Sequence, residues 1–210
     1  MEIKKIIKNK LINNWIREEY LDLDYINNLR KEFSENKPFK YLELKEFFNS
    51  DKIVNILKLL SKEKFQEREA DLFKFMQTDD FKVVNNKVLN DFRDFLKSTE
   101  FISYIEYLTS TKLTNKIDIS GSLYQNTDYL LCHDDQLEGR KIAYFLYFTN
   151  MEESEGGNLN LFYSENGEPT KVVKKIIPKF NTLAFFEVSS ISFHELEEVT
   201  VNKQRIAISG

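Results

Sequence analysis

The spacing of apolar residues changes once along this chain, from a helical repeat to a strand repeat. Over residues 1–115 apolar side chains mostly recur every three or four positions, which predicts amphipathic helices. The expected helices occupy residues 3–15, 22–36, 50–60 and 87–110, with an extended stretch at 39–48 and a helix break near Ser98-Thr99. Asp22 or Asp24 is a suitable cap for the second helix, and Pro38 ends it because a residue before proline avoids helical angles.

From about Lys116 the period becomes two, and polar turns separate short runs. The expected strands are 117–124, 128–133, 141–149, 158–163, 172–177, 182–188, 192–199 and 204–209. Short strands joined by polar turns are typical of a sandwich or jelly roll. The run 142–148 is apolar on both faces, as expected of a strand covered by helices on one side and by a partner sheet on the other. The pattern predicts an α+β fold: a double-stranded β-helix (a cupin-like jelly roll) in residues 116–210, buttressed by helices in residues 1–115 as one structural unit.

The segment 69–81 has no clean period. Phe73 and Phe75 flank Lys74, and Asp79-Asp80 follows shortly after. This mixture of aromatic and charged residues suits a lid that closes over a substrate and excludes water. It also suits an edge strand packed on the helices, and the sequence leaves both interpretations open.

The composition narrows the class of protein. The chain has 210 residues, is 41% hydrophobic and contains 18 Phe and 10 Tyr, which is enough for one domain with a thick core. With 30 basic and 34 acidic residues the net charge is −4, which argues against non-specific nucleic-acid binding. The single cysteine, Cys132, excludes an internal disulfide, and the charged N-terminus suits neither a signal peptide nor a membrane span. We therefore expect a reducing compartment, the cytoplasm or nucleus, with no membrane and no direct nucleic-acid partner.

The run Cys132-His133-Asp134-Asp135 gathers possible metal ligands at the end of an expected strand. Alternate side chains of a strand share a face, so His133 and Asp135 would point the same way. His194, the other of the chain's two histidines, lies in a second strand-like run. Two histidines and one carboxylate form the ligand set of non-heme Fe(II) oxygenases. A lone His-x-Asp is more often structural, but its coincidence with a distant strand histidine and with Arg205 favours a metal site.

Arg205 lies in the last apolar run, 204–209. An arginine buried in a strand needs an anionic partner, and a dicarboxylate co-substrate would supply one. The chain thus combines a candidate metal site with a candidate dicarboxylate site.

These motifs resemble those of the Fe(II)- and 2-oxoglutarate-dependent oxygenases, specifically the ribosomal prolyl hydroxylase branch. The resemblance runs from about Pro38 to the end of the chain. It rests on Asp71–Asp80, Leu130–Ala143, Gly156–Leu159, Ile177–Ser189, Ser192–His194 and Arg205–Gly210. The resemblance implies hydroxylation of a prolyl residue in a protein, most simply a small-subunit ribosomal protein, with O₂ and 2-oxoglutarate consumed and succinate and CO₂ released. Ascorbate is a typical helper of this family.

The resemblance also implies roles for individual residues. His133, Asp135 and His194 would hold Fe(II) and form the catalytic centre. Arg205 would pair with the distal carboxylate of 2-oxoglutarate, a bidentate task for a guanidinium. Tyr147, which by parity faces the barrel interior, would donate its hydroxyl to the same carboxylate. Tyr124 is a further candidate for lining the co-substrate pocket, although it could equally be an ordinary core aromatic.

The chain departs from the family pattern in two places. Many relatives have Arg-x-Ser where this chain has Arg205-Ile206-Ala207, which would remove one hydroxyl contact to the carboxylate. Eukaryotic branch members usually continue into a second, degenerate β-helix domain, so the resemblance implies a catalytic-domain-only relative or a truncated form. Three alternatives stay open: a proline of a translation or transcription factor as the target, a non-catalytic peptide-binding domain, or a cupin-type metal protein that does not use 2-oxoglutarate.

Overall fold

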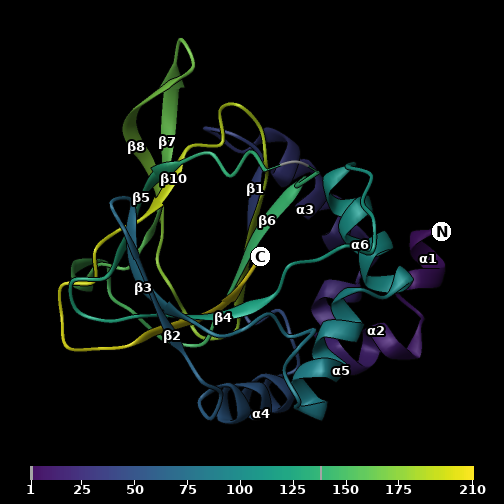
Figure 1. Cartoon of the computed structure of the whole chain (residues 1–210). Helices are drawn as coiled ribbons and strands as arrows, with labels where there is room; N and C mark the ends of the chain where they lie inside the picture. Colours follow the sequence, from purple (N-terminus) through teal and green to yellow (C-terminus); the bar gives the residue numbers. More distant parts are fainter. Residues whose placement is uncertain (1, 138) are drawn as a thin grey trace.

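The computed structural model describes residues 2–137 and 139–210, and its helices lie beside and below a barrel-like sheet (Figure 1). The helices are α1 (Ile3–Ile6), α2 (Lys10–Trp15), η1 (Glu18–Leu21), α3 (Leu23–Glu35), α4 (Ser50–Leu60), α5 (Lys87–Leu96), α6 (Thr99–Thr109) and η2 (Glu153–Glu155). Within the described ranges, none of them combines the length and the apolar character that crossing a bilayer requires.

The helix boundaries follow from capping side chains. Asp22 accepts a hydrogen bond from the amide of Tyr25 and starts α3, and Ser98 starts α6 in the same way. The single helix expected over 3–15 is wrong, because the structure divides it into α1 and α2. The side chain of Asn9 accepts a hydrogen bond from the amide of Leu11 and begins a new helix there. An asparagine offers the backbone this alternative to a continuous helical ladder.

The strands pair antiparallel in the order β1-β9-β6-β11-β4-β3-β5-β10-β7-β8, with β2 paired to β3. Their bounds are β1 (Tyr41–Leu44), β2 (Gln66–Ala70), β3 (Phe73–Gln77), β4 (Ser120–Tyr124), β5 (Tyr129–His133), β6 (Ile142–Tyr147), β7 (Leu159–Glu165), β8 (Glu168–Ile176), β9 (Thr182–Glu187), β10 (His194–Leu196) and β11 (Arg205–Ser209). Every strand expected after residue 116 is present. The first 115 residues are not purely helical, since β1, β2 and β3 come from them and join the sheet. This nearly closed antiparallel barrel confirms the predicted jelly-roll architecture.

Strand β6 separates two apolar cores, and its residues alternate between them. Ala143, Phe145 and Tyr147 pack inside the barrel. Tyr144 and Leu146 belong to the larger core between the sheet and the helices. The sequence predicted a strand here that is buried on both faces, and the structure shows one. Tyr147 lies on the face toward the barrel interior, as the alternation of side chains predicted.

The segment 69–81, for which the sequence left a lid and an edge strand open, contains the end of β2 and the whole of β3 and then reaches the turn that begins at Phe81. Strand β3 pairs with both β4 and β5, and Phe81 is fully buried. The hairpin partner β2 remains exposed along most of its length. The segment is thus part of the sheet, and its movement over a substrate stays a prediction.

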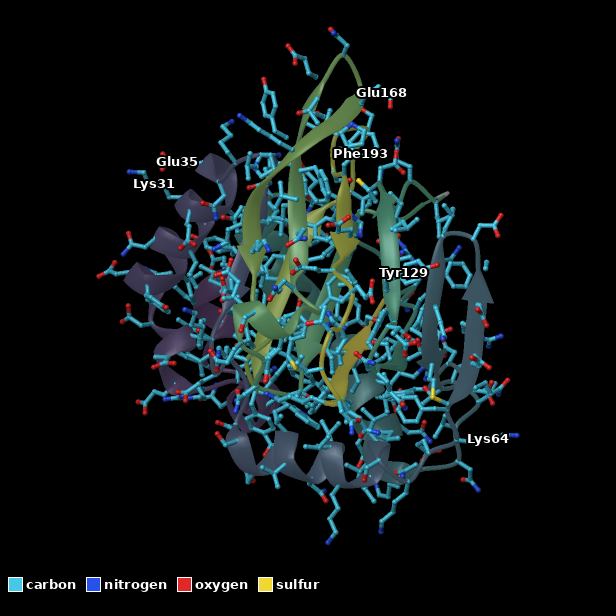
Figure 2. The ribbon with its side chains drawn as sticks, turned by 90° about the vertical axis from the view of Figure 1, so that its left-hand side faces the viewer. Lys31, Glu35, Lys64, Tyr129, Glu168 and Phe193 are labelled. Atoms are coloured by element: carbon cyan, nitrogen blue, oxygen red, sulfur yellow. The ribbon has the colours of Figure 1, made fainter. Side chains whose placement is uncertain are left out.

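A second hairpin, β7–β8, projects beyond the barrel (Figures 1 and 2). Glu168 lies close to its tip, next to the left-handed turn at Asn166 and Gly167. Its exposed apolar residues are Tyr163, Val172 and Val173. This projection stands next to β10, the strand that carries His194.

Candidate functional site

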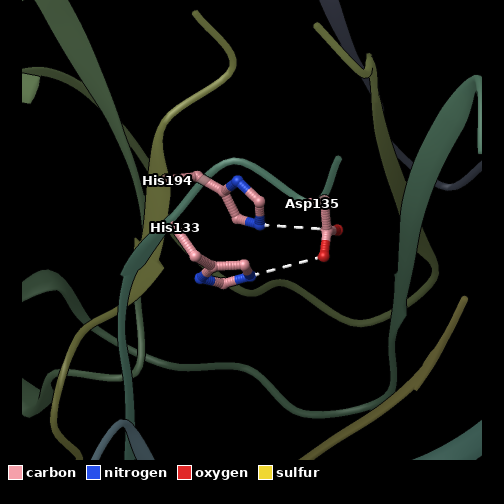
Figure 3. Close-up of side chains that lie close together, drawn as sticks. All are labelled: His133, Asp135 and His194. Atoms are coloured by element: carbon pink, nitrogen blue, oxygen red, sulfur yellow. Dashed lines mark ion pairs between the residues drawn. The ribbon is translucent and has the colours of Figure 1, made fainter. Parts of the chain in front are cut away.

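The two histidines meet across a pair of strands. His133 is the last residue of β5 and His194 the first of β10, and they are direct partners in the antiparallel register. Their ring centroids are 4.2 Å apart (Figure 3). The His194 side chain is fully buried and also packs on the ring of Phe186, 4.6 Å away. Strand pairing thus places two imidazoles that are distant in sequence at one point inside the barrel mouth.

Asp135 completes the cluster, but not from the strand on which we expected it. Strand β5 ends at His133, and Asp135 has a left-handed backbone with φ 59°. Its carboxylate returns toward the histidines, with distances of 3.5 Å from Oδ1 to His133 Nε2 and 3.7 Å from Oδ2 to His194 Nε2. One candidate ligand atom from each residue lies within 4.8 Å of the others. The three predicted residues are therefore together, through a turn rather than through strand alternation.

Hydrogen bonds select the histidine nitrogens that face the cluster. His133 Nδ1 lies 2.8 Å from the carbonyl of Leu131, and His194 Nδ1 lies 2.9 Å from the carbonyl of Ser192. A carbonyl only accepts, so each Nδ1 carries the proton and each Nε2 keeps its lone pair for the cluster. Ser192 Oγ also donates to the carbonyl of Asp134 at 2.9 Å and ties the Asp135 turn to the His194 strand.

The electrostatics favour neutral His194 beside ionised Asp135. Burial lowers the pKa of His194 to about 4. Burial alone would raise the pKa of Asp135, but the hydrogen bond with His133 and the nearby His194 and Arg140 lower it to about 2. For His133, burial lowers the pKa, but the hydrogen bonds to Asp135 and to the Leu131 carbonyl, together with the charges of Asp135 and Asp134, outweigh burial and raise the pKa above the usual 6.5. Lone pairs and a carboxylate charge converging on one point are what a divalent transition metal requires.

Arg140 is a neighbour of this cluster that the sequence did not single out. Its Nη1 lies 3.1 Å from Asp135 Oδ1, and its Nη2 lies 3.5 Å from Asp118 Oδ2. Arg140 thus contacts the same carboxylate oxygen of Asp135 that lies next to His133. No sequence signal distinguishes this arginine from other basic residues, because the contact depends on how the 134–140 turn folds back.

Arg205 is the largest fully buried side chain of the described residues. It begins β11, directly opposite Tyr124 on β4. Its guanidinium carbon lies 5.0 Å from the ring centre of Tyr124 and 5.1 Å from that of Tyr147, so the cation lies against two aromatic rings. The structure therefore brings all three predicted co-substrate residues together, including Tyr124.

Arg205 and Tyr147 have hydrogen-bond donors that are suited to binding an anion. Within residues 2–137 and 139–210, Arg205 Nη1, Arg205 Nη2 and Tyr147 Oη are buried without a hydrogen-bond partner. A buried cation without a counter-charge costs several kcal/mol, so three unused donors at one point fit a bound carboxylate. Burial raises the pKa of Tyr147 to about 12, which keeps its hydroxyl protonated as a donor at neutral pH. His194 Nε2 is likewise without a partner in the described part of the chain, which fits a metal ion at the cluster.

Two further residues shape the arginine site and were missed by sequence reasoning. The carbonyl of Gly157 accepts a hydrogen bond from Arg205 Nε at 2.8 Å. Phe75 of β3 stacks on Tyr124 with ring centroids 4.9 Å apart and an angle of 10°. The sequence indicated only a turn at Gly157 and a lid at Phe75, because neither contact can be deduced before the strand order is known.

Comparison with known proteins agrees with this geometry. The family model of the 2OG-Fe(II) oxygenase superfamily matches residues 119–210, the stretch that carries the cluster and Arg205. Residues 119–210 thus carry the domain of this superfamily. The superfamily's description names Fe(II) and 2-oxoglutarate, which agrees with the cofactors expected from the sequence.

The curated relatives come from one branch of the superfamily. The chain is 37% identical over 177 residues to prolyl 3-hydroxylase OGFOD1 of Xenopus laevis, a match covering 82% of this chain and 34% of that protein. It is 32% identical over 192 residues to prolyl 3,4-dihydroxylase OGFOD1 of Ostreococcus tauri, covering 82% and 37%. The chain thus spans about a third of the length of these relatives.

Solved structures of the superfamily share the fold. A prolyl-4-hydroxylase of Pseudomonas putida superposes with a TM-score of 0.67 at 13% identity, covering 86% of this chain and 96% of that one. A prolyl hydroxylase of Trichoplax adhaerens, solved with a peptide fragment of hypoxia inducible factor, gives a TM-score of 0.67 at 18% identity, covering 91% and 93%. The double-stranded β-helix predicted from the sequence is therefore the fold of this chain.

Proposed function

We propose that this chain hydroxylates a prolyl residue in a protein, using Fe(II), O₂ and 2-oxoglutarate. The proposal rests on the presence of two sites inside the same barrel. One is the cluster of His133, Asp135 and His194, and the other is the buried Arg205 with its unused donors. A metal-binding protein without 2-oxoglutarate would have no use for a buried guanidinium aimed at an anion.

In this proposal His133, Asp135 and His194 hold the metal on one face. The two Nε2 atoms and one carboxylate oxygen are the donors, and the Nδ1 hydrogen bonds fix both rings in the required orientation. When bound, Fe(II) supplies the activation of O₂ that is coupled to the oxidation of 2-oxoglutarate to succinate and CO₂. Arg140 would help to keep the carboxylate of Asp135 in place beside the two histidines.

Arg205 and Tyr147 bind the far carboxylate of 2-oxoglutarate. The two Nη atoms form a fork that matches two carboxylate oxygens, and Tyr147 donates from the side. Tyr124, stacked under Phe75, closes the other side and keeps water away. In such a dry pocket the ion pair is stronger than in water, while Ala207 offers no hydroxyl, which should weaken the binding of 2-oxoglutarate somewhat.

The substrate follows from the relatives and not from the pocket alone. Proteins named prolyl hydroxylases match this chain over most of its length, and one structural neighbour was solved with a peptide. A prolyl residue of a protein, most simply a small-subunit ribosomal protein, is therefore the proposed target. A proline of a translation or transcription factor is the alternative, and a non-catalytic peptide-binding domain is the second.

Mass spectrometry of candidate peptides separates these proposals. Ribosomal and translation-factor peptides would be incubated with the protein, Fe(II), 2-oxoglutarate and ascorbate, and inspected for one added oxygen on proline. Asp135→Ala serves as the matched control protein. Oxygen added to a ribosomal peptide only by the unsubstituted protein supports the proposal. Peptide binding without any turnover of 2-oxoglutarate would replace it with the non-catalytic alternative.

The roles of ascorbate and of the cytoplasm or nucleus stay predictions. Ascorbate should extend the number of turnovers before inactivation, which a progress curve with and without it measures. Imaging of the tagged full-length protein tests the compartment.

A further inference from the structure

A cavity of about 450 Å³ lies on the opposite side of β6 from the candidate active site. Tyr144 and Leu146 form part of its wall, whereas Tyr147 faces the barrel interior. The other walls come from α5, α6, residues 112–118, Leu137, residues 139–142 and β9. Its volume falls in the range of ordinary small-molecule sites, roughly 300–1,000 Å³.

The inner wall of this cavity is apolar. Helices and sheet contribute aliphatic and aromatic side chains that belong to the larger core. They include Leu96, Phe101, Ile105, Leu146, Leu183 and Phe185. A ligand body that lies here loses contact with water along aliphatic and aromatic surface, which is favourable in proportion to the area buried.

The charged residues of the cavity are nearly all basic. Among the described lining residues they are Lys97, Lys112, Lys116, Arg140 and Lys141, and the one carboxylate of that described set is Asp118. The chain as a whole has more acidic than basic residues, 34 against 30, so this excess is local. Arg140 already contacts Asp118, and Lys112 lies 3.7 Å from Glu106. In the described ranges Lys97, Lys116 and Lys141 form no ion pair within 4.0 Å, so their charges remain available to a ligand.

We propose that this cavity binds a small amphipathic carboxylate, a medium-chain aliphatic acid whose tail lies on the apolar wall and whose head group meets the lysines. Charge complementarity excludes a cationic ligand, and the apolar wall excludes a purely polar anion. Walls contributed by helices, loops and sheet on several sides suit a small molecule rather than a flat protein surface. The proposal is independent of the reaction at the metal cluster.

Calorimetric titration with decanoate tests the head group. Decanoate should bind at one site, and decylammonium and decanol, which share its tail, should bind at least tenfold more weakly. The double variant Lys116→Glu/Lys141→Glu should lose at least tenfold in affinity for decanoate. Lys62→Glu/Lys64→Glu makes the same change of charge at exposed lysines outside the cavity lining and should bind as the unsubstituted protein does.

Two further experiments test whether the aliphatic tail of decanoate lies in this cavity. Ile102→Trp fills the cavity from α6 and should abolish binding, with the melting curve showing whether the variant is folded. Arg205→Ala, and saturation with 2-oxoglutarate, should leave decanoate binding unchanged. Absence of binding at millimolar decanoate, equal affinity for decylammonium, or equal affinity of the two lysine variants would overturn the proposal. Competition by 2-oxoglutarate would also overturn it, since the acid would then lie beside Arg205.

Discussion

Replacing Gly157 with alanine tests how closely the co-substrate arginine is held. Gly157 has φ 68°, and its carbonyl receives Arg205 Nε at 2.8 Å. A β-carbon at this position would lie 3.0 Å from Arg205 Cδ and 3.2 Å from Val199 Cγ2. Both contacts are too close, and Val199 is itself fully buried, so the arginine stem must move by a few tenths of an ångström.

The expected loss comes from the guanidinium fork. A shifted fork cannot keep both of its bonds to a carboxylate, and one hydrogen bond to a charged group contributes about 1.5–3 kcal/mol. The dissociation constant of 2-oxoglutarate should therefore rise by roughly 10- to 100-fold. Metal affinity should not change, because Gly157 touches none of the three candidate ligands in the contacts described.

Gly167→Ala is the matched control. Gly167 has φ 84°, and a β-carbon there would meet no atom within 4 Å. Both variants therefore carry an alanine at positive φ, at a cost of roughly 1–2 kcal/mol, and Gly157→Ala should melt at the lower temperature because only it meets Arg205 and Val199 closely. Titration of 2-oxoglutarate into the Mn(II)-loaded proteins then isolates the contact with Arg205. Equal affinities of the two variants for 2-oxoglutarate would refute the reasoning.

Four other predictions concern the same site. Asp135→Ala should weaken Mn(II) binding by more than roughly 100-fold, since losing an outer partner alone costs about 10–100-fold; an unchanged Mn(II) titration would contradict the ligand assignment. Arg205→Ala should raise the 2-oxoglutarate requirement far more than Arg205→Lys, by about 2–5 kcal/mol in binding free energy, and equal apparent affinities in a succinate assay would place the pocket elsewhere. Phe75→Ala should weaken 2-oxoglutarate binding while Phe73→Ala leaves it intact, because only Phe75 stacks on the tyrosine beside Arg205; weaker 2-oxoglutarate binding in both variants, or in neither, would contradict the assignment of Phe75 to the wall of the co-substrate pocket. Burial lowers the pKa of His133, but its hydrogen bonds and the charges of Asp135 and Asp134 together raise the pKa above its usual value, so Mn(II) affinity should fall as the imidazole becomes protonated on acidification; a titration flat down to pH 6 would show that His133 does not bind the metal.

The strands could be predicted because alternation is a local property. Each run of period two after residue 116 became a strand, and the two-faced pattern of β6 correctly indicated a layer on either side. The helix expected over 3–15 failed because the side chain of Asn9 interrupts a spacing that apolar residues alone cannot reveal. The sequence left the segment 69–81 open between a lid and an edge strand for another reason: β3 is set by its pairing with β4 and β5, which lie far away in sequence.

Some residues of the candidate site could likewise be predicted from the sequence, and others could not. His133, His194 and Arg205 stand out in the sequence because few residue types bind metals or carboxylates, and the chain has only two histidines. Asp135 lies beside the two histidines as expected, but a left-handed turn brings it there and not the expected strand. Gly157 and Arg140 act through contacts made only when distant segments meet, so no local pattern marks them.

The two faces of β6 have a consequence for how this chain can change. Substitutions at Ala143, Phe145 or Tyr147 alter the barrel interior, and those at Tyr144 or Leu146 alter the helical side, so each side can vary independently. A change of length is different, because a slip of one residue sends every side chain of a strand to the opposite face. Deleting a single residue in β6 would move the Tyr147 hydroxyl away from Arg205. It would also remove Leu146 from the core between the sheet and the helices. Insertions and deletions should therefore be absent from this strand among functional variants, while the β7–β8 turn tolerates them.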